Sequence, residues 1–224
     1  MKIAILGTGG VGKAFATRLT DLGHEVCVGT RDVSKTLEKD GEAGFKHFQS
    51  LNPKVKLATF SDAAAFGEIV INVSKGANTM DVIKAASSNL KGKVLVDISN
   101  PLDFSNGMPP SLIPEYSNTN SLGEEIQKYL PDTKVVKTLN TMWNGLMINP
   151  ALIGNGDHVN YICGNDTEAK KKVISLLNEF GWKKESLLDL GDINAARATE
   201  AVLPIWLRVY GAKQSGAFNF KIVS

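Results

Sequence analysis

The stretch that decides the fold reads Lys2-Ile-Ala-Ile-Leu-Gly-Thr-Gly-Gly-Val-Gly12, followed by a helical stretch and by Glu25-Val-Cys-Val-Gly-Thr-Arg31. An apolar strand, a glycine turn, a helix and a second strand follow one another, and in this context the spacing G-x-G-x-x-G indicates a dinucleotide site. Gly7 permits the tight turn, Gly9 lets the backbone approach a pyrophosphate, and Gly12 lets helix and strand pack closely. The helix N-terminus offers N–H groups and a positive dipole end to the phosphates. The alternative is a glycine turn that binds nothing.

The end of the second strand indicates which dinucleotide binds. A site for NAD usually places Asp or Glu there, to accept hydrogen bonds from the ribose hydroxyls. This chain has Thr30-Arg31 instead, with Lys35 four residues further on. A hydroxyl, a guanidinium and an ammonium would hold a 2′-phosphate that a carboxylate would repel, which favours NADP(H). Asp32 is the counter-argument, because NAD would be preferred if its carboxylate pointed at the ribose.

Composition sets the broad class. The 224 residues suit one large domain or a nucleotide domain with a small appendage, and a net charge of +2 implies no nucleic-acid or membrane partner. The N-terminus before Gly7 is too short for a signal peptide. Cys27 and Cys163 lie in apolar runs, so we expect buried, reduced, inert thiols and a cytoplasmic protein. The three histidines are scattered, and no metal site is predicted.

Strand-like and helix-like segments alternate along the rest of the chain. Further strands are expected at 56–59, 68–73, 93–98 and 134–139, with helices between them. This alternation predicts an α/β fold, a Rossmann, doubly wound, mostly parallel sheet with a small C-terminal α/β extension. We expect residues 1–155 to form the NAD(P)-binding Rossmann domain. Residues 156–224 are expected to form a strand–helix extension packed on the same sheet.

Within that extension the pattern predicts strands at 158–163 and 186–190. A capping box at Asn165-Asp-Thr-Glu168 is expected to begin a helix that stops at Gly181, and a similar box at Ser121–Glu124 begins another. One long helix is expected from 192 to 209, followed by an irregular arm. Trp143 and Trp206 are expected in the core.

Residues 100–120 contain four prolines, four asparagines and no periodicity. The segment leaves the C-terminal end of the fifth strand, where ligands of open α/β sheets bind. Long loops inside compact domains tend to be functional covers. A lid and a variable surface insertion both remain open.

The available chemistry favours hydride transfer. The chain has no G-x-S-x-G elbow, no H-E-x-x-H and no cysteine in an activating context, and a nicotinamide cofactor carries its own reactivity. The loops after the fourth, fifth and sixth strands should surround the nicotinamide. They carry Val73-Ser74-Lys75, Ser99-Asn100-Pro101 and Asn140-Thr141-Met142-Trp143.

Four motifs resemble those of the F420-dependent NADP oxidoreductases, which pass hydride between NADPH and a deazaflavin. They are Gly7-Thr-Gly-Gly-Val-Gly12, Thr30-Arg31 with Lys35, Val136-Lys-Thr-Leu-Asn-Thr141, and the run from Gly191 to Pro204 that contains Arg197-Ala-Thr-Glu200. The resemblance covers nearly the whole chain, and the last motif is the most specific. The oxidoreductase domain of the STEAP ferric reductases, which reduces ordinary flavin, looks like a relative.

The resemblance implies two groups of site residues, with no catalytic residue assigned. Contacts to the nucleotide are implied for Gly7, Thr8, Gly9, Gly10, Val11, Gly12, Thr30, Arg31, Lys35, Val73 and Ser74, with Asn100 and Thr141 nearer the nicotinamide. A deazaflavin pocket is implied near Asn140, Arg197, Thr199 and Glu200. An i, i+3 surface ion pair is the alternative for Arg197 and Glu200.

The sequence thus predicts a cytoplasmic NADP(H)-dependent oxidoreductase that transfers hydride to a small-molecule acceptor, either coenzyme F420 or a flavin such as FMN or FAD. One alternative is a β-hydroxyacid-type dehydrogenase of a small carbonyl, for which Lys75 is the candidate acid. Another is a non-catalytic NADPH sensor without an acceptor cavity. A homodimer is left open.

Overall fold

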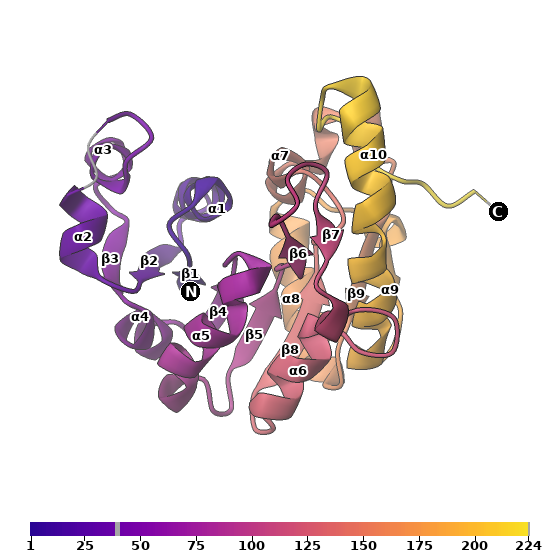
Figure 1. Cartoon of the computed structure of the whole chain (residues 1–224). Coiled ribbons are helices and arrows are strands. Elements are labelled where there is room, and N and C mark those ends of the chain that lie inside the picture. Colours follow the sequence, from indigo (N-terminus) through magenta and orange to yellow (C-terminus); the bar gives the residue numbers. More distant parts are fainter. Residues whose placement is uncertain (39–40, 224) are drawn as a thin grey trace.

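A computed structural model describes residues 1–38 and 41–223 of the protein (Figure 1). Its centre is an eight-stranded sheet in the order β10-β9-β8-β5-β4-β1-β2-β3. These strands are β1 (Lys2–Leu6), β2 (Glu25–Thr30), β3 (Lys56–Thr59), β4 (Ile69–Asn72), β5 (Val94–Asp97), β8 (Lys134–Thr138), β9 (Asn160–Cys163) and β10 (Leu187–Asp189). A separate two-stranded hairpin, β6 (Leu102–Asp103) and β7 (Ser111–Leu112), follows β5.

The predicted fold class is confirmed. Every neighbouring pair in the large sheet is parallel except β8 with β9, which is antiparallel. From β3 to β8 the strands follow the order found in dinucleotide-binding Rossmann sheets. The direction of winding reverses between β1 and β4, so the crevice at their carboxyl ends is where such sheets bind ligands.

Helices cover both faces of the sheet. They are α1 (Gly10–Asp21), α2 (Val33–Glu38), α3 (Phe45–Leu51), α4 (Phe60–Phe66), α5 (Gly76–Ala86), α6 (Leu122–Tyr129), α7 (Asn144–Ile148), α8 (Thr167–Glu179), α9 (Ala196–Ala201) and α10 (Leu203–Lys213). One buried cluster joins α1, α3, α7 and α8 to the sheet, and a second joins α4, α5, α6 and α9 to the other face. Within 1–38 and 41–223, every helix is too short or too polar to cross a membrane.

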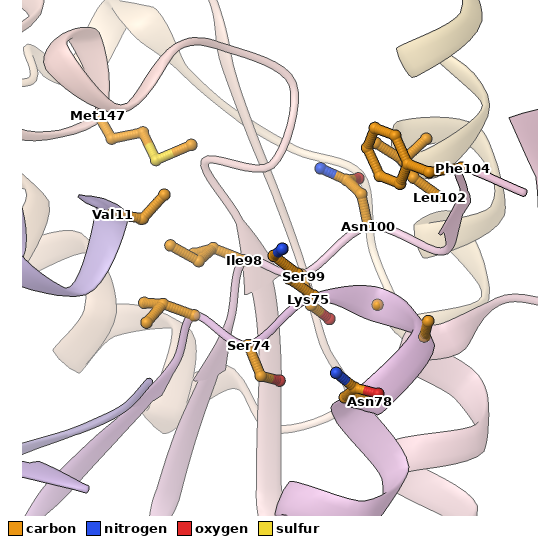
Figure 2. Close-up of a pocket in the computed structure, with 13 residues that line it drawn as sticks. Val11, Ser74, Lys75, Asn78, Ile98, Ser99, Asn100, Leu102, Phe104 and Met147 are labelled. Carbon is orange, nitrogen blue, oxygen red and sulfur yellow. The ribbon is translucent and has the colours of Figure 1, made fainter. Parts of the chain in front are cut away.

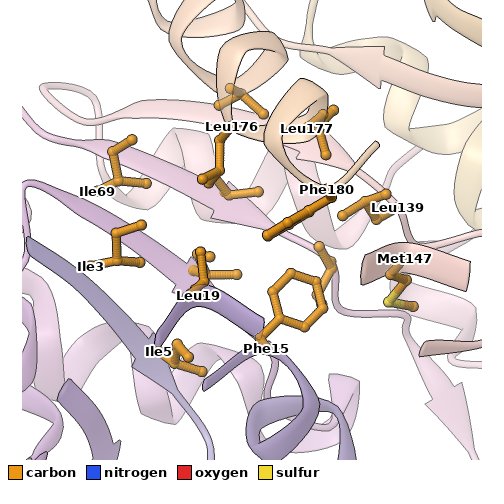
Figure 3. Close-up of a cluster of buried hydrophobic side chains, with 14 of the residues drawn as sticks. Ile3, Ile5, Phe15, Leu19, Ile69, Leu139, Met147, Leu176, Leu177 and Phe180 are labelled. Atoms are coloured by element: carbon orange, nitrogen blue, oxygen red, sulfur yellow. The ribbon is translucent and has the colours of Figure 1, made fainter. Parts of the chain in front are cut away.

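The two cores arise from alternation along buried strands. In β1, Ile3 and Ile5 belong to the first cluster, whereas Ala4 and Leu6 belong to the second. Figure 3 shows the first cluster around α1 and α8, where the ring of Phe15 meets that of Phe180 edge to face with centroids 5.7 Å apart. Because helices pack on both faces of the sheet, a ligand is expected at the carboxyl ends of the strands.

Both thiols are buried, as predicted. Cys27 and Cys163 lie in the second cluster, and burial raises their pKa values to about 11 and about 12. A raised pKa keeps a thiol protonated, and the protonated thiol is a poor nucleophile. Neither cysteine is therefore a candidate for covalent chemistry.

The predicted long helix at 192–209 is wrong. The chain forms a short 3-10 turn at Ile193–Ala195, then α9, then α10, with Pro204 in the first turn of α10. Proline lacks the N–H that would continue the α9 ladder, so a new helix starts there. Helix α10 ends at Lys213, and the residue after it, Gln214, has a left-handed φ of 50°. The arm that follows is irregular, as predicted, and is tied down by a hydrogen bond from the Val159 N–H to the Phe220 carbonyl.

Two local predictions also need correction. Ser121 caps α6 as predicted, but the cap of α8 is Asp166 rather than Asn165, whose side chain instead accepts from the Ile193 N–H. Trp143 is 41% exposed, with the Cα of Gly216 in the terminal arm packed against it, so it is not a core residue. Trp206 is partly buried and stacks between Tyr210 and Phe218.

Candidate functional site

The glycine loop between β1 and α1 has the geometry that its spacing predicts. Gly7 adopts a φ of +135°, and a Cβ on Gly12 would lie 2.1 Å from the Gly7 carbonyl oxygen. Both positions therefore require glycine. A Cβ on Gly9 or Gly10 would meet no atom within 4 Å. The exposed side of the loop is thus open space bordered by backbone.

This open space adjoins the N-terminus of α1. Gly9 is the N-cap residue, and it has no side chain to accept from the first N–H groups of the helix. Helix α1 has no acidic residue in its first turn, so the partial positive charge there has no carboxylate beside it. The combination suits an anionic group such as a pyrophosphate.

At the end of β2, the structure shows what Thr30 and Asp32 do. The buried hydroxyl of Thr30 lies 2.7 Å from that of Thr36, and the Asp32 carboxylate accepts from the Lys35 N–H at 3.0 Å. Asp32 therefore caps the first turn of α2. Arg31 has no ion-pair partner among the described residues, and Lys35 reaches Asp32 only at 3.8 Å.

A small cavity of about 130 Å³ lies beside these residues. Its lining combines one guanidinium, three hydroxyl side chains and one carboxylate with apolar atoms, from Thr30, Arg31, Thr59, Phe60, Ser61, Asp81 and Ala85. Because Arg31 and the hydroxyls meet here, the cavity is suited to the phosphorylated ribose of a dinucleotide.

The main cavity, of about 380 Å³, opens at the carboxyl ends of β4 and β5 (Figure 2). Its lining is mostly apolar with a few polar groups. It comes from the start of α1, the loops after β4 and β5, the start of α5, the hairpin and α7: Val11, Val73, Ser74, Lys75, Gly76, Ala77, Asn78, Ile98, Ser99, Asn100, Leu102, Phe104 and Met147. With Val11 and Val73 in its lining, the cavity adjoins the ends of β1 and β4, between which the winding of the sheet reverses, so it is the candidate site.

A chain of buried hydrogen bonds supports the polar wall of this cavity. Asn72, at the end of β4, accepts from the Ser74 hydroxyl at 2.6 Å and donates to Asp97 at 2.8 Å. Asp97 also accepts from the backbone and hydroxyl of Ser99. The two loops that line the cavity are thereby fastened to each other through their strand ends.

Behind that wall lies a buried ionic cluster, Lys137–Asp97–Glu200, that sequence reasoning missed. The Lys137 ammonium is fully buried and contacts Asp97 and Glu200, each at 2.7 Å, and the Ser99 carbonyl at 2.6 Å. Glu200 also accepts from the N–H groups of Leu122 and Gly123 at the start of α6. The signal available in the sequence was a lysine inside the apolar strand Val135–Thr138.

Two carboxylates around one ammonium set the protonation preferences of the Lys137–Asp97–Glu200 cluster. Burial alone would lower the pKa of Lys137, but the charges of Asp97 and Glu200 outweigh it and raise that pKa. Burial raises the pKa of Glu200 above its ordinary value, against the lowering effect of Lys137. Lys137 is therefore held charged and is not a proton donor for a substrate.

Asn100, implied near the nicotinamide, and Asn140, implied at the acceptor, are hydrogen-bonded to each other in the structure. The side chain of Asn140 donates to that of Asn100 at 2.9 Å, and Asn100 donates back to the Asn140 carbonyl at 2.8 Å. Leu139, with a left-handed φ of 61°, turns the chain immediately before Asn140. The Asn140 Oδ1 is buried and has no hydrogen-bond partner in the described part of the chain. Asn100 lines the cavity, whereas Asn140 and Thr141 lie behind it.

The residues expected near the acceptor on α9 face elsewhere. Arg197 pairs with Glu124 of α6, at 2.8 Å between Nε and Oε2, while Glu200 points into the buried cluster. The alternative of an Arg197–Glu200 surface pair is therefore wrong. Thr199 is buried and donates to the Ala196 carbonyl. None of these three side chains lines the main cavity.

Of the residues expected at the nucleotide, Val11, Val73, Ser74 and Asn100 line the main cavity, and Thr30 and Arg31 line the small one. Phe104, Leu102, Ile98, Asn78 and Met147 also line the main cavity but were not singled out from the sequence. Their apolar or amide character carries no motif, so only the fold could place them. No cluster of three or more potential metal ligands occurs in the described ranges.

The sheet order and the glycine loop together define a dinucleotide-binding Rossmann protein. The model of the family "NADP oxidoreductase coenzyme F420-dependent" matches residues 2–101. The chain is 32% identical to the F420-dependent NADP reductase of Methanocaldococcus jannaschii, over 96% of each chain. It is 30% identical to metalloreductase STEAP3 of Rattus norvegicus, over 92% of this chain but 38% of that protein.

A solved structure is similar over its full length. The crystal structure of a provisionally assigned F420-dependent NADP reductase from Arthrobacter sp. FB24 superposes with a TM-score of 0.95 at 50% identity, covering all of both chains. The chain belongs to the family of F420-dependent NADP reductases and is an NADP-dependent oxidoreductase.

Proposed function

We propose that this protein binds NADP(H) across the edge formed by β1, β2 and β4 and exchanges hydride between its nicotinamide and a flat flavin-like or deazaflavin acceptor in the main cavity. The observation that carries the proposal is the position of that cavity. It begins at Val11 on the phosphate-binding helix and extends past the ends of β4 and β5. One continuous space can therefore take a nicotinamide and a partner ring.

The residues of the chain fit the nucleotide in separate places. The uncapped start of α1 and the open side of Gly9 suit the pyrophosphate. Arg31, Lys35 and the hydroxyl-lined cavity suit a 2′-phosphate, and Asp32 is occupied as a helix cap. These features support NADP(H) over NAD(H), and they support the contacts implied for Thr8, Gly10 and Val73 on the same edge.

When bound, NADPH would supply the hydride that the acceptor ring takes up, and solvent would supply the proton that completes the reduced acceptor. The chain orients the two rings and excludes water, mainly through Val11, Val73, Ile98 and Met147. Ser74, Ser99 and Asn100 provide hydrogen-bonding groups at fixed positions on the polar wall.

Lys75 favours a second candidate, the reduction of a small carbonyl. It lines the main cavity and could supply the proton that an alkoxide requires. A flat ring needs no such acid for the hydride step. The two candidates therefore differ in their dependence on Lys75.

The test is a panel of acceptors, namely coenzyme F420, FMN, FAD and a set of small ketones and 2-oxoacids, followed at the NADPH absorbance. Turnover of a ring acceptor that survives Lys75→Met supports the proposal. Fast turnover of a small carbonyl that is lost in Lys75→Met contradicts it. Tight NADPH binding without turnover of any acceptor supports the sensor instead.

Further proposals concern organisation. We propose residues 1–155 as the Rossmann domain and 156–224 as an extension, which adds β9 and β10 to one edge of the same sheet. Limited proteolysis that released a folded piece ending near residue 155 would support that boundary. A cytoplasmic location accords with two buried free thiols, and the homodimer remains a prediction.

A further inference from the structure

The hairpin after β5 carries an aromatic side chain whose exposure needs an explanation. Phe104 follows β6 directly, lines the main cavity and is nevertheless 54% exposed. A phenylalanine with half of its surface in water gives up apolar burial that a ligand could restore. The neighbouring apolar residue Met108 is 68% exposed but does not line the cavity.

Phe104 is held on an ordered turn. The Asp103 carboxylate accepts from the backbone N–H of Ser105 at 2.8 Å and from its hydroxyl at 2.9 Å. The Gly107 N–H donates to the Phe104 carbonyl at 2.9 Å and closes a four-residue turn. At the base of the hairpin, the Ile113 N–H donates a hydrogen bond to the Pro101 carbonyl and joins its two strands. The ring therefore projects from a fixed backbone position.

The ring lies on the far side of the cavity from the nucleotide loop. Figure 2 shows Phe104 and Leu102 on one side, with Val11 and Met147 on the other and Asn100 between them. A nicotinamide that continues from phosphates at the start of α1 lies on the Val11 side. The space between it and Phe104 is left for a second molecule.

We propose that Phe104 forms the aromatic wall of the acceptor subsite, so that a planar, tricyclic heteroaromatic ring stacks between it and the nicotinamide. This rests on the proposed function and names the residue that makes the site select a flat acceptor. An aromatic face stabilises a stacked ring through dispersion and quadrupole complementarity, and it offers nothing specific to a small aliphatic carbonyl. Leu102 beside it extends the apolar wall.

The position of Phe104 also separates its role from that of the nucleotide site. The pyrophosphate and ribose positions lie at Gly9 and Arg31, on loops that belong to β1 and β2. Phe104 belongs to the hairpin after β5. Removal of the Phe104 ring should therefore weaken binding of the acceptor and leave binding of the nucleotide unchanged.

The experiment measures FMN binding to the full-length protein saturated with NADP+, a complex in which no reaction occurs, by quenching of FMN fluorescence. Phe104→Ala should raise the dissociation constant for FMN about tenfold, as expected for the loss of one stacking partner. Phe104→Tyr should restore it to within about twofold, since the ring is retained. Met108→Ala is the matched control and should leave it unchanged. The KM for coenzyme F420 should follow the same order.

Each outcome has a distinct meaning. If Phe104→Ala binds FMN as the native protein does, or weakens NADP+ binding equally, the assignment of Phe104 to the acceptor is overturned. An equal effect of Met108→Ala also overturns it, because it would point to the hairpin as a whole. If the native protein neither binds FMN or F420 nor reduces them, the proposed function fails. That result is distinguishable from an unaffected Phe104 variant of an active enzyme.

Discussion

The two ends of the ligand-binding edge differ in what their polar groups do. Around β1 and β2, the loop at Gly9 borders open space, and Arg31 is exposed with no ion-pair partner in the described part of the chain. Around β8 and α9, Lys137 and Glu200 satisfy each other inside the protein. The first region is built to receive charge from a ligand. The second pairs its charged groups with each other inside the protein and, through the bond from Lys137 to the Ser99 carbonyl, supports the cavity wall from behind.

This difference shows that residues of a sequence motif can bind other parts of the protein rather than line the cavity. The run Arg197-Ala-Thr-Glu200 carries much of the family resemblance, yet Arg197 binds Glu124 and Glu200 binds Lys137. Its role here is to fasten α9 to α6 and to β8.

Lys137→Met should destabilise the protein by about 3–5 kcal/mol, because it leaves Asp97 and Glu200 buried without their cation. The free energy of unfolding from urea titration checks this. Lys171→Met removes an exposed pair with Glu168 and should change it by less than about 1 kcal/mol. Equal effects of the two variants would show that the Lys137–Asp97–Glu200 cluster has no special structural weight.

Gly9→Val should weaken the binding of both NADPH and NADH at least about a hundredfold, or about 2.7 kcal/mol. The valine side chain would occupy the open space at the start of α1. The fold should persist because no protein atom lies within 4 Å of the new Cβ and the φ of −72° suits any residue. Calorimetric titration measures the affinity, with the exposed Gly211→Ala of α10 as control. Retained affinity in a folded variant would mean that the loop is only a turn.

Arg31→Ala should weaken the binding of NADPH by about 1.5–3 kcal/mol and that of NADH far less. The substitution removes a charge-assisted contact to the 2′-phosphate, which only NADPH carries. The ratio of the two dissociation constants is the measurement. Lys46→Ala, which removes an exposed cation from α3, serves as a charge-matched control. Equal weakening of NADPH and NADH would remove the assignment to NADP(H).

Glu200→Gln and Glu124→Gln should change the pH dependence of stability in opposite directions. Burial raises the pKa of Glu200, so its contribution is present below the ordinary value of 4.5 and is lost as the pH rises through the folded pKa. Burial raises the pKa of Glu124, but the hydrogen bonds from Arg197 and Ser121 lower it by more, so the net pKa is below its ordinary value. The contribution of Glu124 is present above 4.5 and is lost as the pH falls.

Urea titrations from about pH 3.5 to about pH 6.5 span both changes. The difference in free energy of unfolding between the native protein and Glu200→Gln should shrink towards higher pH. The difference for Glu124→Gln should shrink towards lower pH. Parallel trends would contradict the contrast between the fully buried Glu200 and the partly buried, arginine-paired Glu124.

Sequence reasoning succeeded where local patterns determine structure. Apolar runs bounded by turns located the strands, and the spacing of Gly7, Gly9 and Gly12 located the phosphate loop. It failed at Lys137, because its partners Asp97 and Glu200 are 40 and 63 residues away and meet only in the folded sheet. It also placed a single helix over the break at Pro204, since the apolar periodicity continues through it.

The long segment at 100–120 illustrates the same limit. Its proline content predicted a loop, and the structure adds a short hairpin that puts Phe104 at the cavity. Whether it acts as a lid or only as an insertion stays a prediction. A shortened hairpin lacking residues 105–109, assayed with NADPH and a ring acceptor, would leave the rate unchanged if the segment were only an insertion.

The most direct test of the account follows deuterium from NADPH to the acceptor. NADPH labelled at C4 on one face or the other is mixed with coenzyme F420 and the protein in a single turnover, and the reduced deazaflavin is analysed by mass spectrometry. Direct hydride transfer between two rings stacked face to face in one cavity predicts that deuterium from one of the two labelled forms appears in the reduced acceptor. An acceptor reduced without deuterium from either form, or tight NADPH binding without reduction, would contradict it.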